Sequence, residues 1–147
     1  MNKQDGSQYK FVKIAMDFCA DPVWGANYAA TQEEVDSPHY RKGLTLGEPI
    51  GFANLSLEEF TRLPESLIKV FKCYQFIWES LSHALMYDED DNSIEAKLLK
   101  ESVECNNNLS YKLAVEFKKY YPEINVYYNV FDAHTGTYKN KEVLNKQ

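Results

Sequence analysis

Cysteine is scarce in this chain of 147 residues, and no hydrophobic run is long. The three cysteines, Cys19, Cys73 and Cys105, are an odd number and form no CxxC pair. We therefore expect free, buried thiols, because a disulfide framework or a thiolate metal site needs paired spacings. No apolar run approaches the ~20 residues that a membrane-spanning helix requires. The polar start MNKQDGSQ lacks the apolar segment of a secretory signal. Together these absences predict a cytoplasmic protein that does not bind membranes.

Basic residues are outnumbered, with 16 Lys and Arg against 22 Asp and Glu, for a net charge of -6. This balance argues against nucleic acid as a ligand, because binding to phosphates needs a basic surface. The excess of acid lies in the middle of the chain, where residues 15–96 hold fifteen acidic and five basic residues. Such a segment suits a basic protein partner, or is simply a solvated surface.

Recognisable catalytic motifs are missing: there is no GxSxG, no HExxH and no Walker pattern. The strongest candidate for a catalytic or metal-binding site is the end of the first predicted strand, where Asp17, Cys19 and Asp21 occupy alternate positions. Asp132 ends a later strand and would lie nearby if the two strands were parallel neighbours. Carboxylates that cap turns are commoner than catalytic ones, and a packed thiol is commoner than a nucleophile. We expect no cofactor, no metal and no catalytic residue.

Two long helices are the strongest pattern. Residues 64–86 carry an apolar stripe at helical spacing, and Pro64 suits a first turn. The stripe consists of Leu67, Val70, Phe71, Tyr74, Ile77, Trp78, Leu81 and Leu85. Residues 93–121 keep one helical phase through Asn106–Asn108, which predicts a single helix that ends at Pro122. We expect the helix 64–86 to be the centre of the fold. Phe76 lies on the face of this helix opposite the apolar stripe.

Alternating apolar residues predict strands at 9–18 and 124–131, with an edge strand at 138–144. Residues 23–55 have little periodicity, so they form either a functional loop or short strands at 44–46 and 50–52. A short helix at 57–63 follows. The predicted fold class is α+β, a small sheet of strands from both chain ends packed against the two helices. Residues 9–147 form this single domain after a disordered tail at 1–8.

Acidic and aromatic side chains outside the predicted core point to a protein-binding surface. Tyrosine occurs eleven times, and tyrosine beside carboxylate is typical of protein interfaces. The first predicted partner-binding segment follows strand 9–18, and the second is the acidic turn between the long helices. The first contains Asp21, Trp24, Tyr28, Glu33, Glu34 and Asp36, and the second contains Asp88, Glu89, Asp90 and Asp91. The acidic turn has a purely local explanation as well, since negative charge stabilises the start of the next helix.

Two segments carry a family resemblance. KIAMDFCADPVW and NNLSYKLAVEFKKYYPEINVYYNVFD, in this order, resemble the immunity proteins of contact-dependent growth inhibition and related polymorphic-toxin systems in bacteria. The resemblance implies a non-enzymatic protein that binds one cognate toxin domain, often a nuclease, and blocks its active site. The resemblance assigns no catalytic residue to this chain.

The leading hypothesis is therefore a cytoplasmic immunity protein whose acidic, tyrosine-bearing face covers the basic cleft of a toxin nuclease. Two alternatives remain open at this point. One is a small enzyme that uses Asp17, Cys19, Asp21 and Asp132, and the other is an adaptor that self-associates through Phe76 and the tyrosines.

Overall fold

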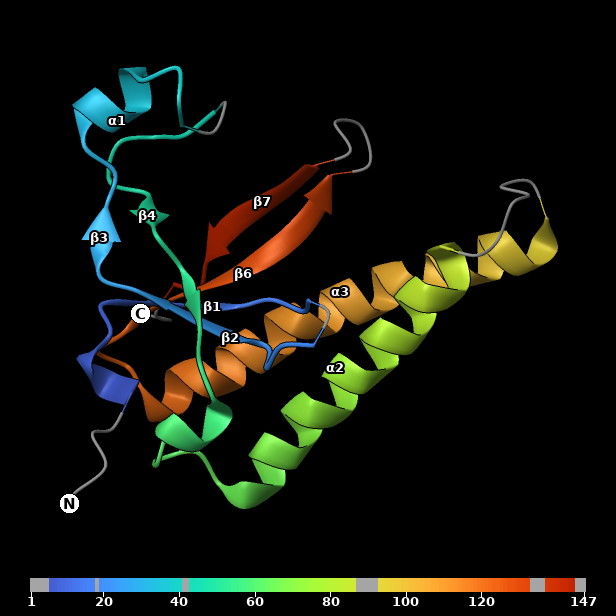
Figure 1. Ribbon diagram of the computed structural model, residues 1–147. Coiled ribbons are helices and arrows are strands. Elements are labelled where there is room, and N and C mark those ends of the chain that lie inside the picture. The colour runs from blue at the N-terminus through green and yellow to red at the C-terminus, as the bar shows by residue number, and fades with distance from the viewer. Residues whose placement is uncertain (1–5, 18, 41–42, 87–92, 133–136, 145–147) are drawn as a thin grey trace.

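Two long helices and a five-stranded mixed sheet form the body of the molecule, which confirms the predicted α+β class (Figure 1). The computed structural model describes residues 6–17, 19–40, 43–86, 93–132 and 137–144. Within those residues, no helix is both long enough and apolar enough to cross a membrane.

The two strands predicted near the chain ends lie side by side at the centre of the sheet. β1 (Phe11–Ile14) pairs in parallel with β6 (Asn125–Asp132), with Val12 opposite Val126. The order is β5-β2-β1-β6-β7, where β2 is Val23–Ala26, β5 is Ala53–Asn54 and β7 is Thr137–Glu142. β7 is the edge strand that was predicted at 138–144. β1 is shorter than the predicted 9–18, because the chain begins to turn after Ala15, whose N–H donates to the Pro22 carbonyl.

Both predicted helices are present. α2 spans Glu65–Met86, and α3 spans Ile94–Tyr120 without a break at the asparagines. The side chain of Ser93 accepts a hydrogen bond from the Ala96 N–H at 3.0 Å and so caps the start of α3. Helical periodicity over more than twenty residues is a strong signal, which explains why both helices could be predicted.

The prediction that the helix 64–86 is the centre of the fold is wrong. α3 lies against β1 and β6, whereas α2 packs mainly on α3. Among the described side chains of α2, only Phe71 and Gln75 are buried. The C-terminal half of α3 supplies Leu113, Ala114 and Phe117 to the main core, where they meet residues of β1, β2 and β6.

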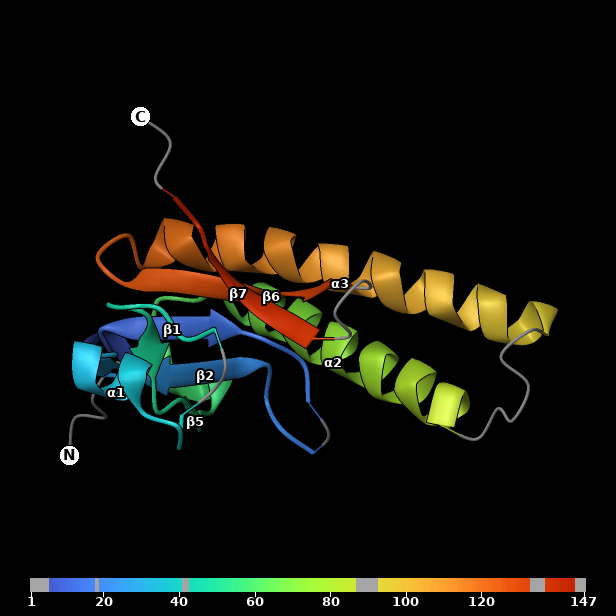
Figure 2. The ribbon, with the colours of Figure 1, turned by 90° about the horizontal axis from the view of Figure 1, so that it is seen from above.

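The distal halves of the helix pair extend beyond the sheet, as Figures 1 and 2 show. Among the residues that the structure describes, no strand lies under these halves, so much of the predicted apolar stripes is exposed. Ile77 of α2 is 45% exposed, and Ile94 and Leu98 of α3 are 67% and 58% exposed. Cys73 and Cys105 also lie on exposed positions, as does Cys19, so the prediction of buried thiols is wrong for all three.

Residues 23–55 are far more structured than predicted. They form β2, β3 (Tyr28–Ala29), α1 (Gln32–Asp36), β4 (Pro49–Ile50) and β5. The strand predicted at 50–52 overlaps β4, but residues 44–46 do not form a strand. Of these three residues only Leu44 is buried. The predicted helix 57–63 is only the 3-10 turn η2, Leu57–Glu59. The predicted tail is also too long, because Gly6–Gln8 forms the 3-10 turn η1 and Gly6 is buried.

A candidate protein-binding surface

A small arm stands off the main sheet. It consists of β3, α1 and β4, and we call it the α1 arm; Figure 1 shows it at the upper left, away from both long helices. β3 and β4 pair antiparallel, with Tyr28 opposite Ile50. Two further backbone hydrogen bonds extend this pairing, from Ala30 N–H to the Glu48 carbonyl (2.8 Å) and from Gly47 N–H to the Ala30 carbonyl (2.9 Å). The paired strands thus hold α1 at the end of the arm.

α1 is held by its own cap and buries nothing. The Glu34 N–H donates to the Thr31 hydroxyl (3.4 Å), and the Thr31 N–H donates to the Glu34 carboxylate (3.0 Å), which together form a capping box. The hydrogen bond from the Thr31 N–H, and then the one from the Thr31 hydroxyl to the same carboxylate (2.8 Å), hold the pKa of Glu34 below its ordinary value. α1 contains no buried residue. Glu34 and Val35 are only partly buried, so burial in the core does not explain why this helix is there.

The arm presents carboxylates between two exposed tyrosines. Glu33 and Asp36 are exposed on α1. Tyr28, which precedes the helix, is 73% exposed, and Tyr40, which follows it, is 47% exposed. Asp36 accepts a hydrogen bond from the Gln32 amide at 3.0 Å, which orients its carboxylate on the helix surface. An exposed aromatic beside a carboxylate offers both contact area and charge to a basic partner.

Three of the predicted partner-binding residues make hydrogen bonds that hold the fold together. Glu34 belongs to the capping box of α1. Asp21 lies at the other end of β2 from the arm, and its carboxylate accepts the Leu57 N–H at 3.0 Å, at the start of η2. Trp24 lies within β2, and its indole N–H donates to the Ala15 carbonyl at 3.0 Å. The structure therefore joins Tyr28, Glu33 and Asp36 on one arm, but not Asp21 or Trp24.

Trp24 instead lines a shallow hollow on the face of the sheet away from the main core. Val12 and Ile14 of β1 point into that core, so Lys13 between them points to the opposite face. The hollow, of about 220 Å³, is lined by Lys13, Ala15, Met16, Asp17, Trp24, Phe52 and Asn129. The Lys13 ammonium lies 4.4 Å from the centre of the Phe52 ring, a cation–π contact. Sequence reasoning missed Lys13 and Phe52; the only signal was a lysine between two buried strand residues.

The second predicted segment, Asp88, Glu89, Asp90 and Asp91, lies outside the described residues, and so does the side chain of Asp132. The backbone of two other members of the alternative enzyme cluster is hydrogen-bonded to side chains of α2. The Asp17 carbonyl accepts a hydrogen bond from the Gln75 amide, and the Cys19 N–H donates to the Glu79 carboxylate at 2.6 Å. In the part of the chain that is described, no three His, Cys, Asp or Glu side chains could hold a metal ion together.

Comparison with known proteins gives no assignment, since no family model, no curated protein and no solved structure matches the chain.

Proposed function

We propose that this chain is a cytoplasmic immunity protein that binds a cognate bacterial toxin domain, a nuclease, and blocks its basic active-site cleft. The observation that carries the proposal is the α1 arm: a capped helix without a buried residue that presents acidic side chains between Tyr28 and Tyr40. A surface feature that adds nothing to the core is readily explained by contact with a partner. The resemblance of the chain to immunity proteins supplies the class of partner.

The mechanism is steric and electrostatic. A nuclease cleft is basic because it must hold a polyanion. Glu33 and Asp36 would attract such a cleft and speed the encounter, whereas Tyr28 and Tyr40 would supply the buried contact area that holds the complex. Once the arm occupies the cleft, RNA or DNA is excluded. No step of this mechanism requires a bond to be made or broken by this protein.

The test uses charge reversal on the arm with a matched control. The partner to be tested is the C-terminal domain of a large secreted effector, sought in the gene immediately upstream and produced with an inactivating substitution. Glu33→Lys with Asp36→Lys should slow association by roughly tenfold or more at low salt, and by less at high salt. Glu101→Lys with Glu104→Lys makes the same change of charge at exposed positions of α3 and should leave the rate unchanged.

Two results would count against the proposal. The wild-type chain could fail to bind the neighbouring effector domain, which would remove the immunity function. Alternatively, the arm variant and the α3 variant could slow association equally, which would show that only net charge matters and that the arm is not the binding site.

A second candidate function is an adaptor that self-associates through the exposed face of α2. Phe76 favours it, because this aromatic side chain is 70% exposed on a helix whose opposite face is packed. Sedimentation velocity across a concentration series decides the matter. A chain that stays monomeric at every concentration excludes the adaptor and leaves the immunity function untouched.

A further inference from the structure

A groove runs between the C-terminal half of α3 and the β6–β7 hairpin, on a different side of the molecule from the α1 arm. Figure 2 shows α1 on one side of the sheet and the end of β7 on the other, beside α3. The groove has a volume of about 830 Å³. Its lining residues are Tyr111, Lys112, Val115, Glu116, Lys118, Lys119, Pro122, Tyr128, Glu142, Val143 and Leu144.

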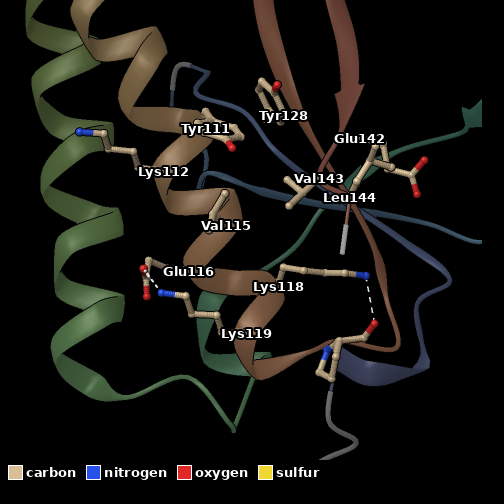
Figure 3. A pocket seen from close by; sticks show the side chains of 11 residues that line it. Tyr111, Lys112, Val115, Glu116, Lys118, Lys119, Tyr128, Glu142, Val143 and Leu144 are labelled. Atoms are coloured by element: carbon tan, nitrogen blue, oxygen red, sulfur yellow. Dashed lines mark hydrogen bonds and ion pairs between the residues drawn. The ribbon is translucent and has the colours of Figure 1, made fainter. Parts of the chain in front are cut away.

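Apolar and aromatic side chains line the groove, and several of them are exposed rather than buried in the core. Figure 3 shows Tyr111 and Val115 of α3 facing Tyr128 and Val143 of the hairpin. The rings of Tyr111 and Tyr128 are 5.0 Å apart with an angle of 58° between their planes. Tyr111 is nevertheless 46% exposed, and Leu144 is 75% exposed.

The charge around the groove is positive, although the whole chain carries -6. The lining holds three lysines and two glutamates. Glu116 is paired with Lys119 at 2.6 Å, whereas the Lys118 ammonium donates to the neutral carbonyls of Pro122 and Ile124. Lys141 adds a further positive charge, because it is the cross-strand neighbour of Tyr128 and so lies on the same face of the hairpin.

We propose that this groove binds a short peptide segment of a partner protein, one with a bulky apolar side chain flanked by carboxylates. The apolar side chain would lie on Tyr111, Val115 and Leu144, and the carboxylates would meet Lys112, Lys118 and Lys141. A peptide fits better than a small molecule, because small-molecule sites enclose most of their ligand and a wall as exposed as Leu144 encloses little. This inference is independent of the proposed immunity function, since it involves other residues on another side.

The test is selection of phage-displayed twelve-residue peptides on the full chain, followed by binding measurements with the enriched peptides. We expect enriched peptides to combine Asp or Glu with Leu, Phe, Tyr or Trp. Tyr111→Ser and Leu144→Ser should each weaken their binding by about tenfold or more, as truncated interface anchors do. Leu144→Ser guards against misfolding as an explanation, because this side chain is largely exposed.

Charge-reversal variants measure how much the lysines around the groove contribute to the affinity for the peptide. Lys112→Glu with Lys141→Glu should weaken the enriched peptides and reduce the dependence of their affinity on salt. Lys97→Glu with Lys100→Glu, on the distal half of α3, should not. Enrichment of basic peptides, no enrichment above an unrelated control protein, or equal affinity for the wild type and both serine variants would overturn the inference.

Discussion

The hydroxyl of Tyr121 accepts a hydrogen bond from the backbone N–H of Arg62 at 3.0 Å, which joins the end of α3 to the segment before α2. The Arg62 guanidinium also lies 4.5 Å from the centre of the Tyr121 ring and is paired with Glu123 at 2.6 Å. Tyr121 is completely buried, and its ring packs against Phe60 and Phe117. One tyrosine therefore serves both the core and the connection between the helices.

Replacing Tyr121 by Phe should lower the free energy of unfolding by about 1 kcal/mol, because the ring stays while the Arg62 N–H loses its acceptor. Urea denaturation measures this change. Tyr120→Phe is the matched control, since Tyr120 is adjacent and 36% exposed, and it should cost much less. Equal costs for the two variants would show that the Tyr121 hydroxyl contributes nothing specific.

Gly25 permits the close approach of two side chains to β2. A Cβ atom at this position would lie 2.5 Å from Leu55 Cδ1 and 2.8 Å from Tyr9 Cδ1. Gly25→Ala should therefore lower the free energy of unfolding by about 1–3 kcal/mol through overpacking. In a Leu55→Ala background the same methyl group should cost less, and a double-mutant cycle measures that difference. If the cost is the same in both backgrounds, the clash with Leu55 is not its cause.

The ion pair between Lys72 and Glu58 predicts an acid-sensitive contact between α2 and η2. Hydrogen bonds from Lys72 and then Ser56 lower the pKa of Glu58 from 4.5 to about 2. Since the folded state holds this carboxylate ionised, its stabilisation is present above pH ~4.5 and is lost as the pH falls toward 2. Both side chains are about half exposed, so solvent limits the contribution to roughly 0.2–1 kcal/mol.

Lys72→Met tests this pair. The difference in the free energy of unfolding between wild type and variant should shrink as the pH falls from 6 to 3. Lys69→Met is the control, because its partner Glu65 lies 3.8 Å away and both side chains are largely exposed. A difference that does not depend on pH would contradict the account.

The cap of α1 should matter locally rather than globally. Thr31→Ala removes the side chain that accepts the Glu34 N–H, at a cost of about 0.5–2 kcal/mol to the helix. Because α1 buries no residue, amide exchange over residues 32–37 should become faster while the melting temperature hardly changes. A large fall in the melting temperature would mean that the arm supports the core, and the argument that it exists for a partner would fail.

Long elements could be predicted from the sequence because their patterns repeat. The helices at 65–86 and 94–120 cover several turns each, and β1 and β6 alternate apolar residues toward one face. Their burial could not be predicted in the same way. Periodicity reveals the face of a helix but not where the sheet beneath it ends, so Ile94 and Leu98 follow the pattern and remain exposed.

Short elements escaped prediction because two to five residues do not complete a period. α1 could still have been found, since Thr31 and Glu34 have capping-box spacing. Of the candidate surface, Tyr28, Glu33 and Asp36 were predicted and lie together on the α1 arm. Asp21 and Trp24 lie close to Tyr28 in the sequence but not on the arm. Their hydrogen bonds to Leu57 and Ala15 are tertiary contacts, which no local sequence pattern reveals.

Competition with nucleic acid tests the central claim most directly. The active C-terminal domain of a secreted effector identified in the upstream gene is titrated with this protein while cleavage of a labelled RNA or DNA substrate is followed. We predict that cleavage stops at one equivalent, that excess substrate delays the inhibition, and that Glu33→Lys with Asp36→Lys weakens it. A domain that binds this protein and yet cleaves at its full rate would contradict the account.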